Sequence, residues 1–276
     1  MGIKAQVSIA HKLGFTSHQN AVPLLRELIL HNESEETFQD LTLHLRTAPA
    51  VLEEKKWNID RLLPGTSLDI RDRDIKLNAE WLAELTESVL CEVTLSLRQG
   101  EEELFITHYP LEALAKNEWG GSAMIELLPS FIIPNDPAVD RVLKATSDVL
   151  RRAGKDDALN GYESKSRTRV WEIASALWTA VCNLNISYAL PPASFERNGQ
   201  KIRTPGAILE GKVATCLDTT LLFASALEQI GLNSLLMLSE GHAFAGVWLQ
   251  PQEFSQLVTE DVSAVRKRVD LKEMVV

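Results

Sequence analysis

The stretch GKVATCLDTTLLFASALEQIGLNSLLMLSEGHAFAGVWL, residues 211–249, decides how the second half of this chain folds. Thr215, with Asp218 three positions further on, resembles a capping box, so we expect a helix to begin at Thr215 or Cys216. Apolar residues then recur at helical spacing, and Gly231 is a typical helix stop. The sequence therefore predicts a helix with a cysteine in its first turn.

Two short strands are predicted to follow that helix. Residues 235–238 form the first, SEG is a tight turn, and residues 242–249 form its antiparallel partner. His242 opens the second strand and therefore lies at one end of the sheet. A helix start packed against this end would bring Cys216 and His242 together.

The chemistry of such a pair is that of a thiol nucleophile and its base. Unpaired N–H groups and the positive end of the helix dipole favour the thiolate form of Cys216, and His242 could act as the general base. The alternative is that both are ordinary residues of a folded core, since single cysteines and histidines are far more often structural than catalytic. The joint pattern of loop, cysteine, helix, turn and histidine favours chemistry.

This joint pattern resembles the core of the transglutaminase-like superfamily, relatives of the papain-type cysteine peptidases, over roughly residues 165–276. The resemblance implies that Cys216 is the nucleophile, that Asp218 is the frequent acidic neighbour and that His242 is the base. It implies acyl transfer or amide hydrolysis on a protein or peptide substrate. No cofactor or metal is expected, and the three cysteines have no metal-like spacing.

The third member of that family's site, usually an aspartate, lies on the strand after the histidine strand and orients the imidazole. Here a helix-like insertion follows Leu249, and the chain then ends with DLKEMVV. Asp270 is expected at the wrong end of the sheet, because an antiparallel partner of His242 belongs several residues into a strand starting near Glu273. We therefore expect the third residue beyond Val276 and the domain to be truncated there.

The first part of the chain, residues 1–125, is predicted to be an immunoglobulin-like β-sandwich. Period-two alternation predicts strands and places Cys91 on the inward face as a small buried thiol. The expected strands span residues 23–34, 41–47, 66–77 and 91–100, with one or two helical turns at 78–87.

A segment rich in proline, glycine and asparagine, residues 111–137, is expected to be an extended connection. The second domain, residues 135–276, then has helices from Pro137 to Gly154 and over residues 163–188, with Cys182 packed in the core. Residues 189–206 are a loop by composition. The fold class expected for the whole chain is α+β.

The net charge of −10 is uneven: residues 1–134 carry 12 Lys and Arg against 21 Asp and Glu, and the remainder carries 16 against 17. Neither half has the cation cluster that nucleic acid requires, so direct nucleic-acid binding is not expected. No apolar run is long enough for a membrane helix and no signal peptide is recognisable. Reduced thiols in the cytoplasm are the simplest expectation.

A wider resemblance is to the N-terminal region of large bacterial proteins that carry a helicase and often a nuclease, several of them suspected of acting against phage. PLLRELILHN, LPG, NEWGG and the Cys–His block carry it. It implies that helicase and nuclease domains of a longer chain are partners. Three functions stay open: a thiol acyl-transfer enzyme, a catalytically inactive recognition or regulatory module of such a protein, and a structural protein with no site.

Overall fold

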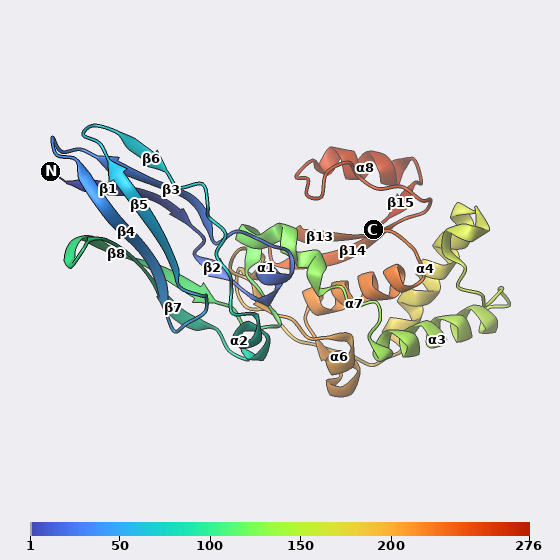
Figure 1. Cartoon of the computed structure of the whole chain (residues 1–276). Helices are drawn as coiled ribbons and strands as arrows, with labels where there is room; N and C mark the ends of the chain where they lie inside the picture. Colours follow the sequence, from blue (N-terminus) through green and yellow to red (C-terminus); the bar gives the residue numbers. More distant parts are fainter. Residues whose placement is uncertain (1) are drawn as a thin grey trace. The chain divides into compact units, whose positions relative to one another are not determined.

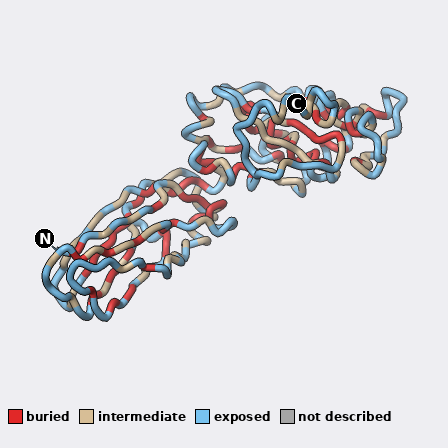
Figure 2. The backbone as a smooth tube through the Cα atoms, turned by 90° about the horizontal axis from the view of Figure 1, so that it is seen from above, coloured by how far each residue is buried: buried red, intermediate tan, exposed pale blue. Residues whose placement is uncertain are grey.

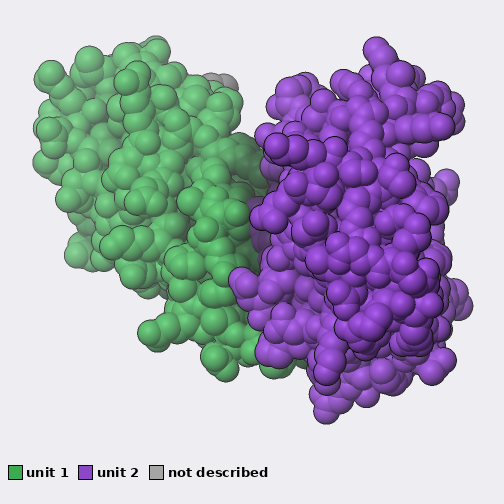
Figure 3. Space-filling model, turned by 90° about the vertical axis from the view of Figure 1, so that its right-hand side faces the viewer, with its two compact units in different colours: residues 1–118 green, residues 119–276 purple. Residues whose placement is uncertain are grey.

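The computed structural model of the chain describes residues 2–276. It divides the chain into two compact units, one ending at Glu118 and the other running from Trp119 to Val276 (Figure 3). Strands dominate the first unit, whereas the second combines helices with short strands. The mixture is consistent with the α+β class expected from the sequence.

The first unit is built mainly from long strands (Figure 1). Its elements are β1 (Ile3–Ile9), β2 (Lys12–Leu13), α1 (Phe15–Gln19), β3 (Leu25–Asn32), β4 (Phe38–Ala48), β5 (Lys55–Leu62), β6 (Ser67–Asp69), α2 (Ala79–Glu84), β7 (Val89–Gln99) and β8 (Glu102–Ala113). The helical turns expected at 78–87 are α2, which starts at an Asn78 cap. The strand expected at 66–77 is shorter than predicted, because only the three residues of β6 pair.

These strands form two sheets that share one apolar core. The order in the larger sheet is β2-β8-β7-β4-β5, and in the smaller it is β1-β3-β6. Buried and exposed positions alternate along the strands (Figure 2), so one face of each is apolar. Leu30 of β3 and Leu43 of β4 belong to the shared core. Cys91 is buried as predicted, and removal from water raises the pKa of its thiol.

The second unit is mostly helical. After β9 (Glu118–Trp119), its elements are η1 (Gly121–Phe131), α3 (Pro137–Arg152), η2 (Gly161–Ser164), α4 (Arg167–Cys182), β10 (Ser187–Tyr188), α5 (Phe195–Asn198), β11 (Gln200–Lys201), α6 (Pro205–Gly211), β12 (Val213–Ala214), α7 (Cys216–Gln229), β13 (Ser234–Ser239), β14 (His242–Trp248), α8 (Val262–Asp270) and β15 (Met274–Val275). The loop expected at 189–206 therefore contains a helical turn and a short strand.

The extended connection expected over 111–137 is wrong. The 3₁₀ segment η1 occupies its middle, and Leu128 and Phe131 of η1 are buried with Trp119 in the second unit's core. Proline and glycine indicated a loop, but the apolar side chains between them are buried, and this burial decides the structure. The segment is therefore part of the second unit.

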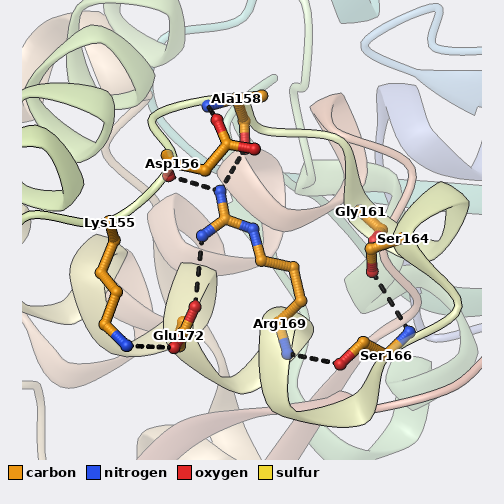
Figure 4. A network of polar contacts seen from close by, with 8 residues as sticks. All are labelled: Lys155, Asp156, Ala158, Gly161, Ser164, Ser166, Arg169 and Glu172. Carbon is orange, nitrogen blue, oxygen red and sulfur yellow. Dashed lines mark hydrogen bonds and ion pairs between the residues drawn. The ribbon is translucent and has the colours of Figure 1, made fainter.

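Local capping explains where the helices begin. Asp136 caps α3 by accepting a hydrogen bond from the Ala138 amide at 2.8 Å, as predicted. The helix α4 starts later than expected because Ser166 is its N-cap, and it ends earlier than expected, at Cys182. Arg169 in its first turn donates to the carbonyl oxygens of Asp156 and Ala158 and so fastens the preceding loop to the helix (Figure 4).

The predicted helix and hairpin of residues 211–249 are confirmed. The strands β13 and β14 pair antiparallel from Ser239 opposite His242, and Gly241 in the turn has a φ of +70°, which glycine adopts without strain. The helix α7 shares an apolar core with the sheet through Leu222 and Val247. This packing sets the start of α7 and the hairpin turn at the same end of the sheet.

Candidate thiol site and aromatic groove

The start of α7 is a complete capping box. The Thr215 hydroxyl accepts a hydrogen bond from the Asp218 amide at 3.2 Å, and the Asp218 carboxylate accepts one from the Thr215 amide at 2.9 Å. Cys216 is therefore the first residue of the helix, as the sequence predicts.

The acidic neighbour Asp218 is fully buried and fully engaged. Besides Thr215, its carboxylate accepts hydrogen bonds from the Arg203 amide at 2.8 Å and from the Arg203 guanidinium at 2.9 Å. Both partner residues, Arg203 and Thr215, lie beside the first turn of α7. Asp218 thus acts as a structural cap, and within residues 2–276 it makes no hydrogen bond or ion pair with His242.

The Cys216 thiol is buried among apolar side chains. Its cluster includes Leu217, Phe195 and Ala243. Tyr188 of β10 lies beside the thiol: the pKa of this phenol is raised, first by desolvation of the ring and then by its interaction with the Cys216 side chain. The thiol therefore interacts with a phenol, and no hydrogen bond among residues 2–276 joins it to an imidazole.

Gln200 of β11 is a further polar neighbour of the helix start. Its Nε2 donates to the Thr215 hydroxyl at 2.9 Å, whereas its buried Oε1 has no hydrogen-bond partner among residues 2–276. Sequence reasoning missed both residues. Gln200 lies in a segment that reads as loop, Tyr188 lies at the end of the expected helix, and both approach Cys216 only through the fold.

His242 is next in the chain to Ala243, which packs with Cys216, but the His242 side chain points away from the thiol. Its ring is exposed and stacks on Phe244, two positions along the same strand, with ring centroids 6.1 Å apart. Ala243 between them is buried in the Cys216 cluster. Successive side chains of a strand point to opposite faces of the sheet. The imidazole of His242 therefore points away from the face on which Ala243 packs with Cys216. Within residues 2–276 no hydrogen bond joins the thiol and the imidazole.

Asp270 is the last residue of α8 and lies outside the sheet. The strand β15 pairs Met274 with Trp248 and Val275 with Val247, which is the end of β14 remote from His242. The expected direction of this strand is therefore confirmed. Asp270 precedes β15 in the chain, next to the end of β14 that is far from His242.

A groove opens next to the thiol, on the side of α4. It has a volume of about 190 Å³ and is lined mainly by apolar side chains: Trp178, Val181, Cys182, Ile186, Tyr188, Ala214, Thr219 and Phe223. Trp178 is 63% exposed and Tyr188 59% exposed, although the Trp178 ring stacks on Phe223 with centroids 5.5 Å apart. Cys182 is exposed, so its expected place in the core is wrong.

The sequence contained a signal for this groove. The buried positions of α4, such as Val170, Ile173 and Leu177, define one face of the helix. Trp171 and Trp178, seven residues apart, fall outside that face. Trp178 lines the groove and Trp171 does not, so the exposed ring of Trp178 is the one that indicates a surface with a partner, because a large apolar side chain is costly to leave in water.

No family model matches the chain, and no curated protein matches its sequence. Within the described residues no three His, Cys, Asp or Glu side chains lie close enough to hold a metal ion. Among the same residues no helix is both long and apolar enough to span a bilayer.

Proposed function

We propose that the second unit is a recognition module that binds an apolar side chain of a protein or peptide in the groove between α4 and α7. In this proposal the unit keeps a transglutaminase-like scaffold without a working Cys–His pair, and an immunoglobulin-like sandwich precedes it. The observation that carries the proposal is the groove itself, whose two largest rings, Trp178 and Tyr188, are each more than half exposed.

The surroundings of Cys216 support binding over catalysis. A general base must reach the proton that it removes, at about 2.6–3.2 Å or through one water. The His242 ring instead stacks on Phe244 at the surface, and the thiol is buried beside Tyr188. Within residues 2–276 no carboxylate makes a hydrogen bond or ion pair with the imidazole, and Asp218 is committed to Arg203 and Thr215.

The size and lining of the groove favour a single side chain as its occupant. Its volume of about 190 Å³ is below the roughly 300–1,000 Å³ of sites that enclose a whole small molecule. Aromatic walls recognise apolar and aromatic groups through area burial and ring stacking. The module would therefore read a leucine-like or aromatic residue in an extended or helical peptide.

The wider resemblance suggests where that peptide belongs. We propose that it lies in the helicase or nuclease portion of a longer parent polypeptide, or in a protein that regulates it. A cytoplasmic location is part of this proposal, in keeping with three unpaired thiols at positions 91, 182 and 216.

A peptide-display selection against the 276-residue chain tests the proposal. We expect enriched peptides to share one large apolar residue, and Trp178→Ser to weaken their binding by about tenfold or more. Trp171→Ser is the matched control, since it removes an exposed tryptophan from the same helix outside the groove, and should leave affinity unchanged. Cys216→Ala should also bind normally. Equal losses in the two tryptophan variants would contradict a role for the groove.

A thiol acyl-transfer enzyme is the second candidate. Cys216 at the start of a 14-residue helix, level with the hairpin that carries His242, is the feature that favours it. Iodoacetamide labelling at pH 7, followed by peptide mass spectrometry in a Cys182→Ser background, separates the candidates. The recognition module predicts slower labelling of Cys216 than of free cysteine. Much faster labelling, lost in His242→Ala, would favour the enzyme.

A further inference from the structure

The outer face of the five-stranded sheet in the first unit contains a polar hollow of about 300 Å³. It lies over β4, β5, β7 and β8, on the face opposite the apolar core, and is lined by Thr42, His44, Arg46, Lys56, Ser96, Arg98, Glu103 and Ile106. Three of these eight residues are Lys or Arg, although residues 1–134 carry an excess of nine acidic charges.

The strand register explains how the hollow forms. His44 lies opposite Lys56 on one side and opposite Ser96 on the other, and Thr42 lies opposite Arg98. Short hydroxyl side chains therefore occupy the centre of the face, while long cationic side chains from three adjacent strands surround them. Because the side chains at the centre are short and those at the rim are long, the sheet surface is concave at this point.

The polar groups of the hollow are only partly satisfied by the protein. His44 is held by Glu54 at 3.0 Å, and Arg98 is held loosely by Glu103 at 3.4 Å. The side chains of Arg46, Lys56 and Ser96 make no hydrogen bond or ion pair within residues 2–276, although their backbones pair in the sheet. Two cations and one hydroxyl thus share a hollow without a partner of their own.

We propose that this hollow binds a small phosphate monoester. A tetrahedral phosphate presents several oxygens in different directions, so it can accept hydrogen bonds from Arg46, Lys56 and the Ser96 hydroxyl together. Ile106, which is partly exposed at the edge, offers an apolar wall to the organic part of the ligand. This site is independent of the groove in the second unit.

Titration of the full chain with 5′-AMP at constant ionic strength, followed by NMR of the labelled protein, tests the site. We expect saturable shifts centred on His44 and Ser96, with a Kd on the order of 1 mM because exposed charges are screened by water and salt. Adenosine should produce no saturable shift, and inorganic phosphate should compete. Competition by acetate at equal strength would overturn the assignment to phosphate.

Variants with opposite expected effects sharpen the test. Arg46→Gln with Lys56→Gln should weaken 5′-AMP binding by about tenfold or more, whereas Glu103→Gln should strengthen it by about twofold, since it frees Arg98. Arg141→Gln with Lys144→Gln, two exposed cations of α3, changes the net charge equally and is the control. Equal weakening in both double variants would mean general charge attraction and would overturn the site. A short single-stranded oligonucleotide that binds over a hundredfold tighter than 5′-AMP would overturn the small-ligand proposal.

Discussion

The start of α7 and the outer face of α4 lie in the same unit but differ in the burial of their side chains. Around Cys216 the capping groups pair with one another, and the Asp218 carboxylate alone accepts three hydrogen bonds. On α4, Trp178 and Cys182 remain exposed. The region around Cys216, which contains the residue types used in catalysis, is buried and internally hydrogen-bonded. The outer face of α4, which is mainly apolar, is exposed and could contact a partner.

The largest effect should come from opening the closed region. Asp218→Ala removes a fully buried carboxylate and leaves the Arg203 and Thr215 donors without their acceptor, so we expect a loss of about 3 kcal/mol or more in the free energy of unfolding. Urea unfolding followed by circular dichroism measures it. Asp270→Ala, at an exposed position of α8, should change stability by less than about 0.5 kcal/mol. Similar losses in both variants would show that the capping network is not what holds α7 in place.

A smaller effect is expected from the other half of the capping box. Thr215→Val keeps the shape of the side chain but removes the acceptor of the Asp218 amide and of Gln200, which should cost about 1–2 kcal/mol. Thr215→Ser restores the hydroxyl and should recover most of the loss in the same urea experiment. If serine fails to recover it, packing of the threonine methyl rather than capping holds the helix start.

The open region should tolerate truncation. Trp178→Ser is expected to lower the free energy of unfolding by less than about 1 kcal/mol, mainly through the lost stacking on Phe223, because most of the ring is already in water. The same truncation of the buried Trp119 should cost about 3–5 kcal/mol. A large loss at Trp178 would make the groove a structural feature, and the recognition proposal would lose its support.

Sequence patterns predicted those parts of the fold that depend on neighbours in the chain. The capping box at Thr215 and Asp218, the hairpin turn at Gly241 and the alternation along β4 are all local, and each is confirmed. Burial of η1 depends on distant residues, so composition alone misled.

The candidate site divides in the same way. The pattern placed Cys216 at the helix start and His242 at the start of its strand, and both positions are confirmed. The face to which the imidazole points depends on strand register and twist, and the approach of Tyr188 and Gln200 depends on tertiary packing. One sequence contains no local signal for these contacts. The position of Trp178 on the outer face of α4 was readable, since helical spacing alone determines it.

The smallest expected effect concerns the network that fastens α4, and it is pH-dependent. Glu172 is bound by Lys155 at 2.7 Å and by Arg169 at 3.3 Å, and these contacts, with Lys155 the larger cause, hold the pKa of its carboxyl below the ordinary value of 4.5 (Figure 4). A carboxyl with a depressed folded-state pKa stabilises the protein above pH 4.5, and this contribution disappears as the pH falls through the folded-state pKa.

Glu172→Gln should therefore lower the urea midpoint slightly at pH 7 and have a smaller effect at pH 3, where more of the native carboxyl is protonated than at pH 7. The effect is small because the network lies near the surface, where water and salt screen the charges. Glu210→Gln, at an exposed position without an ion pair among the described residues, should leave the midpoint unchanged at both pH values. A Glu172 effect of the same size at pH 3 and pH 7 would mean that hydrogen-bond geometry, rather than charge, fastens the loop to α4.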